Sequence, residues 1–135
     1  MNSAITFLPE DPSDEEVHSV VERSTPWVRF QRGAADSGNG RVYWERYSDI
    51  FKEYEEEIRL NLVELGAVEK YCWVFDYSMG LEAIKQVLLS ICARWPDTVV
   101  DLDIGTPMLG PEFRDRLSVD PSWDWWNSQP ENDVN

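Results

Sequence analysis

The chain has 135 residues, of which 26 are Asp or Glu and 12 are Lys or Arg, so its net charge at pH 7 is -14. A chain of this length forms one domain with a sizeable core. The excess of carboxylates argues against binding to nucleic acids or to anionic membranes, since both require a basic surface. Three uses of the charge remain: attraction of a basic partner, binding of a cation, and solubility.

The two cysteines, Cys72 and Cys92, lie in apolar segments, and no Cys-x-x-Cys or Cys/His spacing accompanies them. We therefore expect both to be reduced core residues and the chain to hold no zinc. The N-terminal segment lacks the basic and apolar regions of a signal peptide, and no apolar run is long enough to span a membrane. These features predict a cytoplasmic protein without a cofactor or a metal ion.

Hydrophobic periodicity and turn residues predict elements in the order β-α-β-β-α-β-α-β. In chain order they are a strand at 4–9, a helix at 12–24, strands at 27–32 and 41–47, a helix at 48–66, a strand at 68–78, a helix at 78–96 and a strand at 97–105. Residues 106–126 follow as an arm interrupted by proline and glycine, with one helical turn at 111–117.

Local signals support the ends of several elements. Ser13 stands before an acidic first turn and a stripe of valines, as helix N-caps do. Ser48 is expected to cap the helix 48–66, which Gly66 ends. The alternating segments 27–32 and 41–47 predict an antiparallel hairpin with a mobile loop at 33–40. The strand 68–78 is β-rich on both faces, which predicts a central position in the sheet.

The first six elements match a split β-α-β, ferredoxin-like core, to which the last helix and strand are an addition. We therefore predict an α+β fold with a mixed or antiparallel sheet and helices on one face. The segment 71–105 also has the form of a β-α-β crossover, which makes its two strands parallel. Residues 1–126 are predicted to form this single domain, and residues 127–135 a disordered tail.

Catalytic signatures are missing from the sequence. The only histidine, His18, lies on an acidic helix and is interpreted as a surface residue. The triplet at 95–97 matches a phosphatase loop in letters alone, since no cysteine loop with a following arginine accompanies it. We therefore predict that the protein is not an enzyme. An enzyme that uses carboxylates alone would need two convergent, buried carboxylates in a cleft.

Acidic residues also raise the question of a metal site. Asp101 and Asp103 alternate along the strand 97–105, so both should project from one face while Val100 and Leu102 face the core. With Asp97 they could bind a hard cation, but the glycine-containing loop of calcium sites is missing. A charged outer face suits an edge strand, and we favour that interpretation.

The helix 48–66 carries carboxylates at three-, four- and seven-residue steps, opposite its apolar spine. These residues are Asp49, Glu53, Glu56, Glu57 and Glu64. They form either a solvated face, partly paired with Lys52 and Arg59, or a carboxylate surface that opposes a basic groove on another protein.

Aromatic residues gather in two places. Tyr71, Trp73, Phe75 and Tyr77 alternate within the strand 68–78, so their rings should share one face. They are either core beneath the helices or a surface that needs a cover. Trp123, Trp125 and Trp126 flank Asp124 near the C-terminus. These tryptophans either fold back onto the aromatic strand or anchor a partner.

The segments DIFKEYEEEIRLNLVE, DLDIG and DPSWDWW combine carboxylates with aromatic and apolar residues. With the small α+β architecture, they resemble the immunity proteins of bacterial toxin–immunity systems, and also phage-encoded inhibitors that mimic DNA. The resemblance implies a non-enzymatic inhibitor that binds and blocks a basic partner protein, such as a toxin domain.

From their charge and aromatic character, we assign a set of partner-binding residues. They are Asp49, Glu53, Glu56, Glu57, Glu64, Asp101, Asp103, Trp123, Asp124, Trp125 and Trp126. The alternative is a domain that binds a small molecule or a divalent cation in an aromatic-lined pocket.

Overall fold

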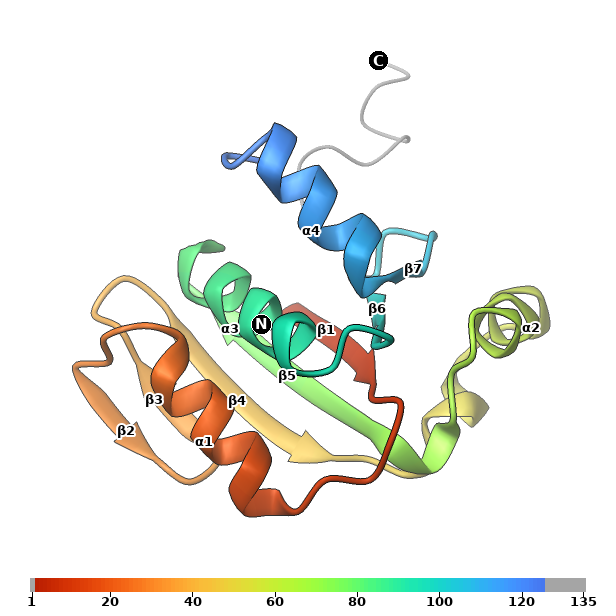
Figure 1. Ribbon diagram of the computed structural model, residues 1–135, viewed down its shortest axis with the longest axis horizontal. Helices are drawn as coiled ribbons and strands as arrows, with labels where there is room; N and C mark the ends of the chain where they lie inside the picture. The colour runs from red at the N-terminus through yellow and green to blue at the C-terminus, as the bar shows by residue number, and fades with distance from the viewer. Residues whose placement is uncertain (1, 126–135) are drawn as a thin grey trace.

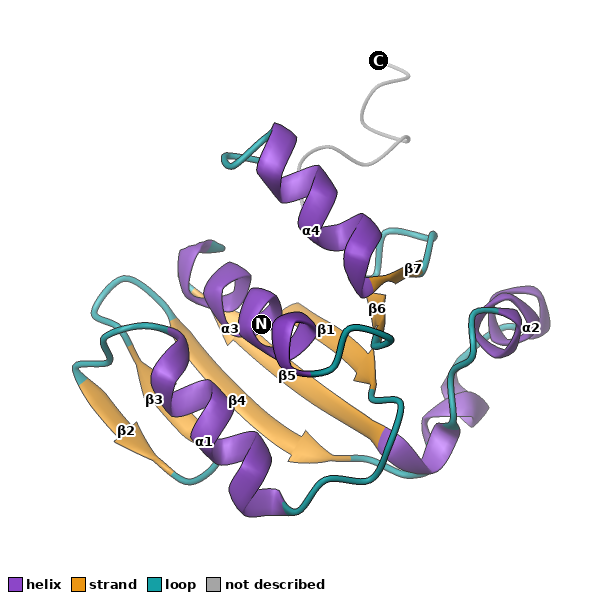
Figure 2. Cartoon of the chain, in the orientation of Figure 1, coloured by secondary structure: helices purple, strands orange, loops and turns teal. Residues whose placement is uncertain are grey.

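A computed structural model describes residues 2–125, which form a seven-stranded antiparallel sheet with helices packed against it (Figures 1 and 2). The strands are β1 (Asn2–Phe7), β2 (Arg29–Gln31), β3 (Ala34–Asp36), β4 (Arg41–Arg46), β5 (Cys72–Ser78), β6 (Val99–Asp101) and β7 (Met108–Leu109), in the order β2-β3-β4-β5-β1-β6-β7. The α-helices are α1 (Asp14–Ser24), α2 (Glu56–Glu64), α3 (Glu82–Arg94) and α4 (Gly110–Val119), and the 3-10 helices are η1 (Ile50–Glu53) and η2 (Glu69–Tyr71).

The α+β class is confirmed, and the centre of the sheet has the split β-α-β order. Strands β1 and β4 are parallel on either side of β5, and β5 and β6 are parallel on either side of β1. Helix α1 lies between the first pair in the chain, and α3 between the second. The ferredoxin-like core is therefore β1-α1-β4-β5-α3-β6, and its additions are β2–β3, η1–α2 and β7–α4. The prediction that the last helix and strand are the addition is wrong, because α3 and β6 belong to the core and the segment 48–66 does not.

The predicted hairpin between 27–32 and 41–47 is wrong. Strand β2 pairs with β3, and β3 pairs with β4, so the segment expected to be a mobile loop contains a strand. Gly33, with φ +82°, supplies the left-handed conformation in the turn between β2 and β3. Small residues in this segment resembled a loop, but they also suit a short strand that a tight turn places in register.

The single helix predicted at 48–66 is divided into η1 and α2. Tyr54 and Glu55 have extended backbone conformations between them, with ψ of 145° and 153°. The apolar spacing continues across the break, which is why the pattern predicted one helix. Ser48 is not a cap, because Asp49 precedes η1 and makes no capping side-chain bond. Gly66 does follow α2, with φ +100°.

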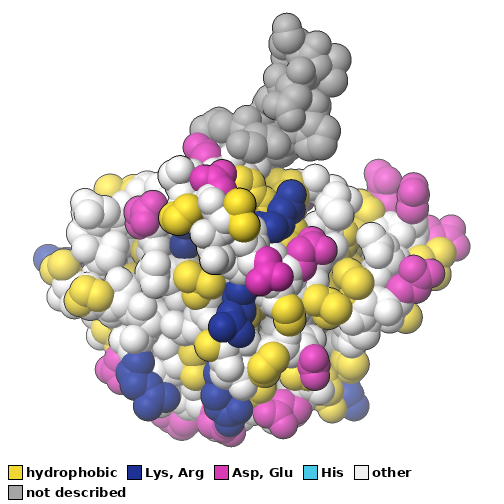
Figure 3. All heavy atoms as spheres, turned by 45° about the horizontal axis from the view of Figure 1, so that its top comes forward, with side chains coloured by type: hydrophobic (Ala, Val, Ile, Leu, Met, Phe, Trp, Pro, Cys, Tyr) yellow, Lys and Arg dark blue, Asp and Glu magenta, His cyan; other side chains and the backbone are white. Residues whose placement is uncertain are grey.

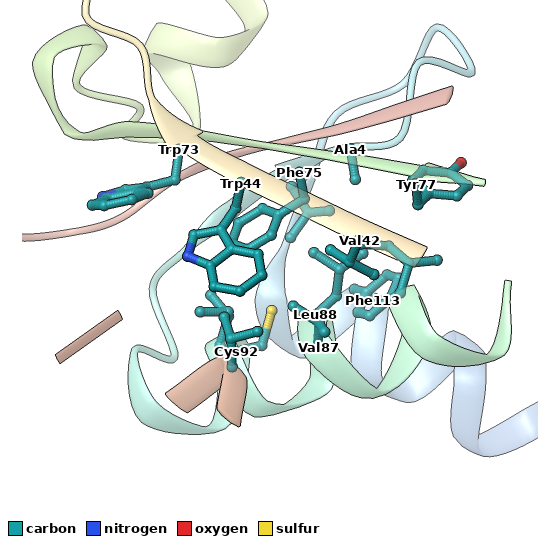
Figure 4. Packing of buried hydrophobic residues seen from close by; sticks show 14 of the residues in the cluster. Ala4, Val42, Trp44, Trp73, Phe75, Tyr77, Val87, Leu88, Cys92 and Phe113 are labelled. Carbon is teal, nitrogen blue, oxygen red and sulfur yellow. The ribbon is translucent and has the colours of Figure 1, made fainter. Parts of the chain in front are cut away.

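The larger core lies between the sheet and α1, α3 and α4. Figure 4 shows Trp44 of β4 and Phe75 of β5 among residues of this core, together with Leu88 and Cys92 of α3. Helix α4 packs closely against α3 at its first residue, Gly110. A Cβ atom there would lie 2.9 Å from a backbone oxygen, so only glycine permits this approach.

The opposite face of the sheet carries a second, smaller core. Alternation along the strands directs Phe7, Cys72 and Val99 to this face, where Ile50 of η1 and Leu62 of α2 cover them. The expectation of helices on one face therefore holds for α1 and α3 but not for α2. In Figure 1, α2 lies at the end of the sheet away from α1. We call η1 and α2, with the residues between them, the η1–α2 arm.

The alternating aromatic residues of β5 are core. Trp73, Phe75 and Tyr77 are buried beneath the helices, whereas Tyr71 belongs to η2 and lies outside the strand. The cysteines are also buried and unpaired, as predicted, and burial raises the pKa of each thiol to about 12. Among the helices of residues 2–125, none combines the length and the apolar character that a membrane crossing requires.

Candidate functional site

A groove lies between the η1–α2 arm and the adjoining ends of β1 and β6, with a volume of about 420 Å³. Its lining includes four carboxylates and no lysine or arginine. The carboxylates are Glu53, Glu55, Asp101 and Asp103. We call this feature the acidic groove. Two of the four carboxylates lie at 53–55 and two at 101–103, so the fold, not local spacing, assembles the groove.

The end of β6 positions two of the carboxylates. After Asp101 the chain leaves the strand, and Asp103 adopts φ +62°, in the left-handed region. The Asp103 backbone N–H donates to Oδ1 of Asp101 at 2.9 Å, which closes this turn. The prediction that both aspartates project from one strand face is therefore wrong, because Asp103 lies in a turn beyond the strand.

Asp101 is buried, with 4% of its surface exposed, and not solvated as the sequence pattern suggested. The hydroxyl of Tyr54 donates to its Oδ2 at 2.5 Å. Burial, and then the nearby Asp101 charge, raise the pKa of Tyr54 well above its usual range, so the phenol remains a donor. This bond fixes the buried carboxylate and joins the η1–α2 arm to the sheet at the point where the helix breaks.

Asp103 is exposed as a residue but not fully hydrated. Desolvation by the surrounding groove raises the pKa of its carboxyl, and the charge of Asp101 raises it further. The negative charge of Asp101 therefore makes ionisation of Asp103 less favourable, and a cation bound beside the two carboxylates would offset this repulsion.

The remainder of the groove is largely apolar. Ile5 of β1, Ile50 of η1 and Ile58 of α2 contribute to its lining beside the ring of Tyr54. An apolar wall next to carboxylates suits a ligand with an aliphatic stem and a positive head. Lysine and arginine side chains have that composition.

The outer surface of α2 combines charge with exposed apolar residues. Leu60 and Val63 are 56% and 51% exposed, and a helix places residues three apart side by side. Glu56, Glu57 and Glu64 are exposed on the same short helix. Figure 3 shows Asp and Glu side chains gathered toward the right, at the α2 end of the molecule.

The predicted carboxylate residues of the helix are all exposed and all belong to the η1–α2 arm or its start. They do not form one face over four helical turns, because the helix is broken at Tyr54 and Glu55. Glu53 joins Asp101 and Asp103 in the acidic groove, whereas Asp49, Glu56, Glu57 and Glu64 are not part of its lining.

Of the two alternatives for the C-terminal tryptophans, the structure supports folding back onto the domain for Trp123 and Trp125, so these two are not exposed anchors. Trp125 is fully buried, and its Nε1 donates to the hydroxyl of Tyr77 at 3.0 Å. Trp123 is 9% exposed and packs against Phe113 of α4. Both fold back onto the domain, because burying such large apolar surfaces stabilises the fold. Asp124, which is half-buried, lines a different cavity, one that includes Tyr77.

Two predictions from the sequence concern residues that the structure does not describe. Trp126 and the predicted tail at 127–135 lie outside residues 2–125.

Sequence reasoning missed the role of Tyr54 and misjudged His18. Tyr54 lies in the apolar stripe of the predicted helix. Its hydroxyl could have indicated its role, because a buried tyrosine hydroxyl needs a hydrogen-bond partner. His18 is half-buried, and its Nδ1 accepts a hydrogen bond from Nε1 of Trp44 at 2.8 Å. The histidine therefore belongs to the contact between α1 and β4 and is not a surface residue.

The geometry of the described residues gives little support to a metal site or to an enzyme based on carboxylates. Within residues 2–125, no group of three or more His, Cys, Asp or Glu side chains is arranged to hold a metal ion. An enzyme based on carboxylates would need two that are buried and convergent. Of the pair in the acidic groove, Asp101 is buried but already hydrogen-bonded at both oxygens, and Asp103 is exposed.

Comparisons of the chain with protein-family models, with curated proteins and with solved structures give no match. The functional argument therefore depends on the geometry and charge of the acidic groove and the η1–α2 arm.

Proposed function

We propose that this protein is a non-enzymatic inhibitor that binds and blocks a basic partner protein through the acidic groove and the η1–α2 arm. The observation that carries the proposal is the lining of the groove: four carboxylates and three isoleucines, without a lysine or an arginine. The immunity proteins that the chain resembles act in this way, by covering the basic site of a toxin.

Charge supports this proposal beyond the groove. A net charge of -14 attracts a basic protein over distances of the Debye length and raises the rate of encounter. The same charge repels nucleic acids and anionic membranes. Exposed Leu60 and Val63, near the carboxylates of α2, add apolar surface that a partner can bury. With two unpaired, buried cysteines, the protein suits a reducing compartment such as the bacterial cytoplasm.

The test starts from capture of the partner. The tagged full chain is used to isolate proteins from the native host at low salt, and each captured protein is expressed with and without this chain. We expect a basic protein that harms the host when alone and is neutralised by co-expression. Its affinity should fall steeply as salt is raised. A captured protein that is acidic, or whose binding is flat across salt, would contradict the proposal.

A second candidate function is binding of a small cationic molecule in the same groove, whose volume is sufficient for one. It predicts that an amine or a divalent cation raises the melting temperature of the purified chain without any partner. An unchanged melting temperature with spermidine, calcium and magnesium would reject it.

A further inference from the structure

We propose that the acidic groove receives one arginine side chain of the partner, with its aliphatic stem along the isoleucines and its guanidinium at the carboxylates. This inference rests on the proposed function and specifies the contact that the partner makes. The centre of the proposed interface is therefore the junction of the η1–α2 arm with β1 and β6, and not the tryptophans that the sequence suggested as anchors.

In the part of the chain that the structure describes, the groove carboxylates are paired with no cation. Within residues 2–125, none of the four forms an ion pair with a lysine or an arginine. Elsewhere the chain pairs its charges: Arg46 bonds to Asp11 and Asp14, and Arg94 bonds to Glu16. The negative charge that the fold concentrates in the groove therefore remains available to a cation from outside.

One carboxylate of the groove is held in place by the fold itself. The bonds from Tyr54 and from the Asp103 backbone hold Asp101 in a single position. A fixed carboxylate loses little conformational freedom when a cation arrives, so more of the attraction appears as affinity. Asp103 lies two residues away on the same turn. Its carboxylate is repelled by that of Asp101, and a bound cation would relieve this repulsion.

The apolar lining selects the rest of the ligand. The side chains of Ile5, Ile50 and Ile58 offer contact to methylene groups, which an inorganic cation lacks. The same lining contains the ring of Tyr54, over which a cation can also be stabilised.

Arginine fits these features better than lysine. Its guanidinium is planar, weakly hydrated and able to donate to two carboxylates at once, whereas an ammonium is compact and strongly hydrated. A groove with carboxylates on both the η1–α2 arm and the β6 turn offers acceptors to both sides of a planar donor.

The experiment titrates the isotope-labelled full chain with three blocked amino acids and follows the amide signals by NMR. The probes are N-acetyl-arginine methylamide, its lysine analogue and its citrulline analogue, which has nearly the shape of arginine without the charge. We expect saturable shifts at 53–58 and 101–105, with affinity falling about tenfold from arginine to citrulline, the ratio set by loss of a charged contact. Equal shifts with citrulline, tighter binding of the lysine analogue, or shifts spread over the surface would overturn the proposal.

Two matched variants separate the groove from the overall charge. Asp103→Asn removes a groove carboxylate, and Asp97→Asn removes an exposed carboxylate that does not line it. The first should weaken arginine binding about fivefold, and the second should leave it unchanged. Equal effects of the two substitutions would overturn the assignment to the groove.

The outcome is distinguishable from failure of the proposed function. If the captured partner binds in a salt-dependent manner but blocked arginine does not shift the groove signals, the arginine contact is wrong and the inhibitor function stands. If blocked arginine occupies the groove but every captured protein is acidic, the proposed function fails and the site remains.

Discussion

Two regions of this chain combine carboxylates with large apolar residues, but only one of them leaves those apolar residues exposed. Trp123 and Trp125 of the C-terminal segment, for which the sequence left core and partner anchor as alternatives, are core, whereas the η1–α2 arm, predicted as one amphipathic helix, is broken and leaves Leu60 and Val63 in solvent. The comparison teaches that the apolar area of a residue and its position in the chain do not decide whether it is exposed. Exposure is decided by whether a neighbouring surface can cover the residue.

The physical reason lies in what each region can reach. The tryptophans meet the ring of Phe113 and the hydroxyl of Tyr77, so they satisfy both apolar and polar needs within the domain. Helix α2 has nine residues, a length that is marginal without tertiary contacts, and it buries only Leu62 fully. The remaining apolar residues of its outer surface have no partner among the residues that the structure describes.

The largest expected effect comes from Trp125→Ala. Removing this fully buried ring should destabilise the protein by about 3–5 kcal/mol, because the cavity adds to the lost burial. Urea unfolding followed by tryptophan fluorescence and circular dichroism measures it. Truncation after Val119, which removes Trp123, Trp125 and Trp126, should destabilise at least as much. A near-normal melt with lost partner binding would return the tryptophans to the interface and remove the contrast between the two regions.

Tyr54→Phe should have the next largest effect, at the junction of the arm with the sheet. Buried Asp101 would lose its hydroxyl donor, which costs about 1–3 kcal/mol. Hydrogen exchange at 56–64 should accelerate as the arm loosens. Tyr47→Phe is the matched control, since its hydroxyl also donates to a carboxylate, that of exposed Glu53, and little change is expected. Equal effects of the two substitutions would mean that the Tyr54 bond does not hold the arm.

Asp103→Asn tests whether the charge of the groove serves a ligand or the stability of the fold. The raised pKa of Asp103 means that the folded state binds its proton more readily than the unfolded state. Ionisation therefore opposes folding above the ordinary pKa of 3.8, and the variant should be more stable at pH 7 by a few tenths of a kcal/mol, reduced by solvent screening.

The gain from Asp103→Asn should shrink as the pH falls through the raised pKa of the folded state toward 3.8 and disappear below 3.8, where the native side chain is protonated in both states. Urea unfolding at pH 7 and at about pH 3 gives the two values. A loss of stability at pH 7 would show that the Asp103 charge is used within the fold.

The smallest expected change in stability is that of Leu60→Ser on the outer surface of α2. Because the side chain is 56% exposed, the free energy of unfolding should change by less than about 0.5 kcal/mol. Leu62→Ala, two positions away and fully buried, provides the contrast and should cost about 2–5 kcal/mol. If Leu60→Ser destabilises as strongly, the outer surface is packed within the domain and is not available to a partner.

Sequence signals of short range predicted the structure well. Ser13 is the expected N-cap, Gly66 follows α2 in the left-handed region, and alternation placed Trp73, Phe75 and Tyr77 on one face of the strand, which the structure shows to be buried. These features depend on neighbours a few positions apart, so the chain itself displays them. The α+β class followed from the order of the elements.

Features decided by distant contacts could not be predicted in the same way. The helix break at Tyr54 accompanies a bond to Asp101, which is 47 positions later, and periodicity carries no information about such a partner. The burial of Asp101 likewise depends on the arm that covers β6. The acidic groove was partly anticipated, because Glu53, Asp101 and Asp103 were candidates by charge, but their meeting with Ile5 and Ile58 required the fold.

The most direct test of the central claim compares two double variants that change the net charge equally. Glu53→Gln with Asp103→Asn alters the acidic groove, and Glu22→Gln with Asp97→Asn alters exposed carboxylates outside it. Affinity for the captured partner is measured at low and high salt. The groove variant should bind about tenfold or more weakly at low salt with a shallower salt dependence, and the control should bind as the native chain does. Equal losses in the two variants, or no loss in either, would contradict the assignment of function to the groove.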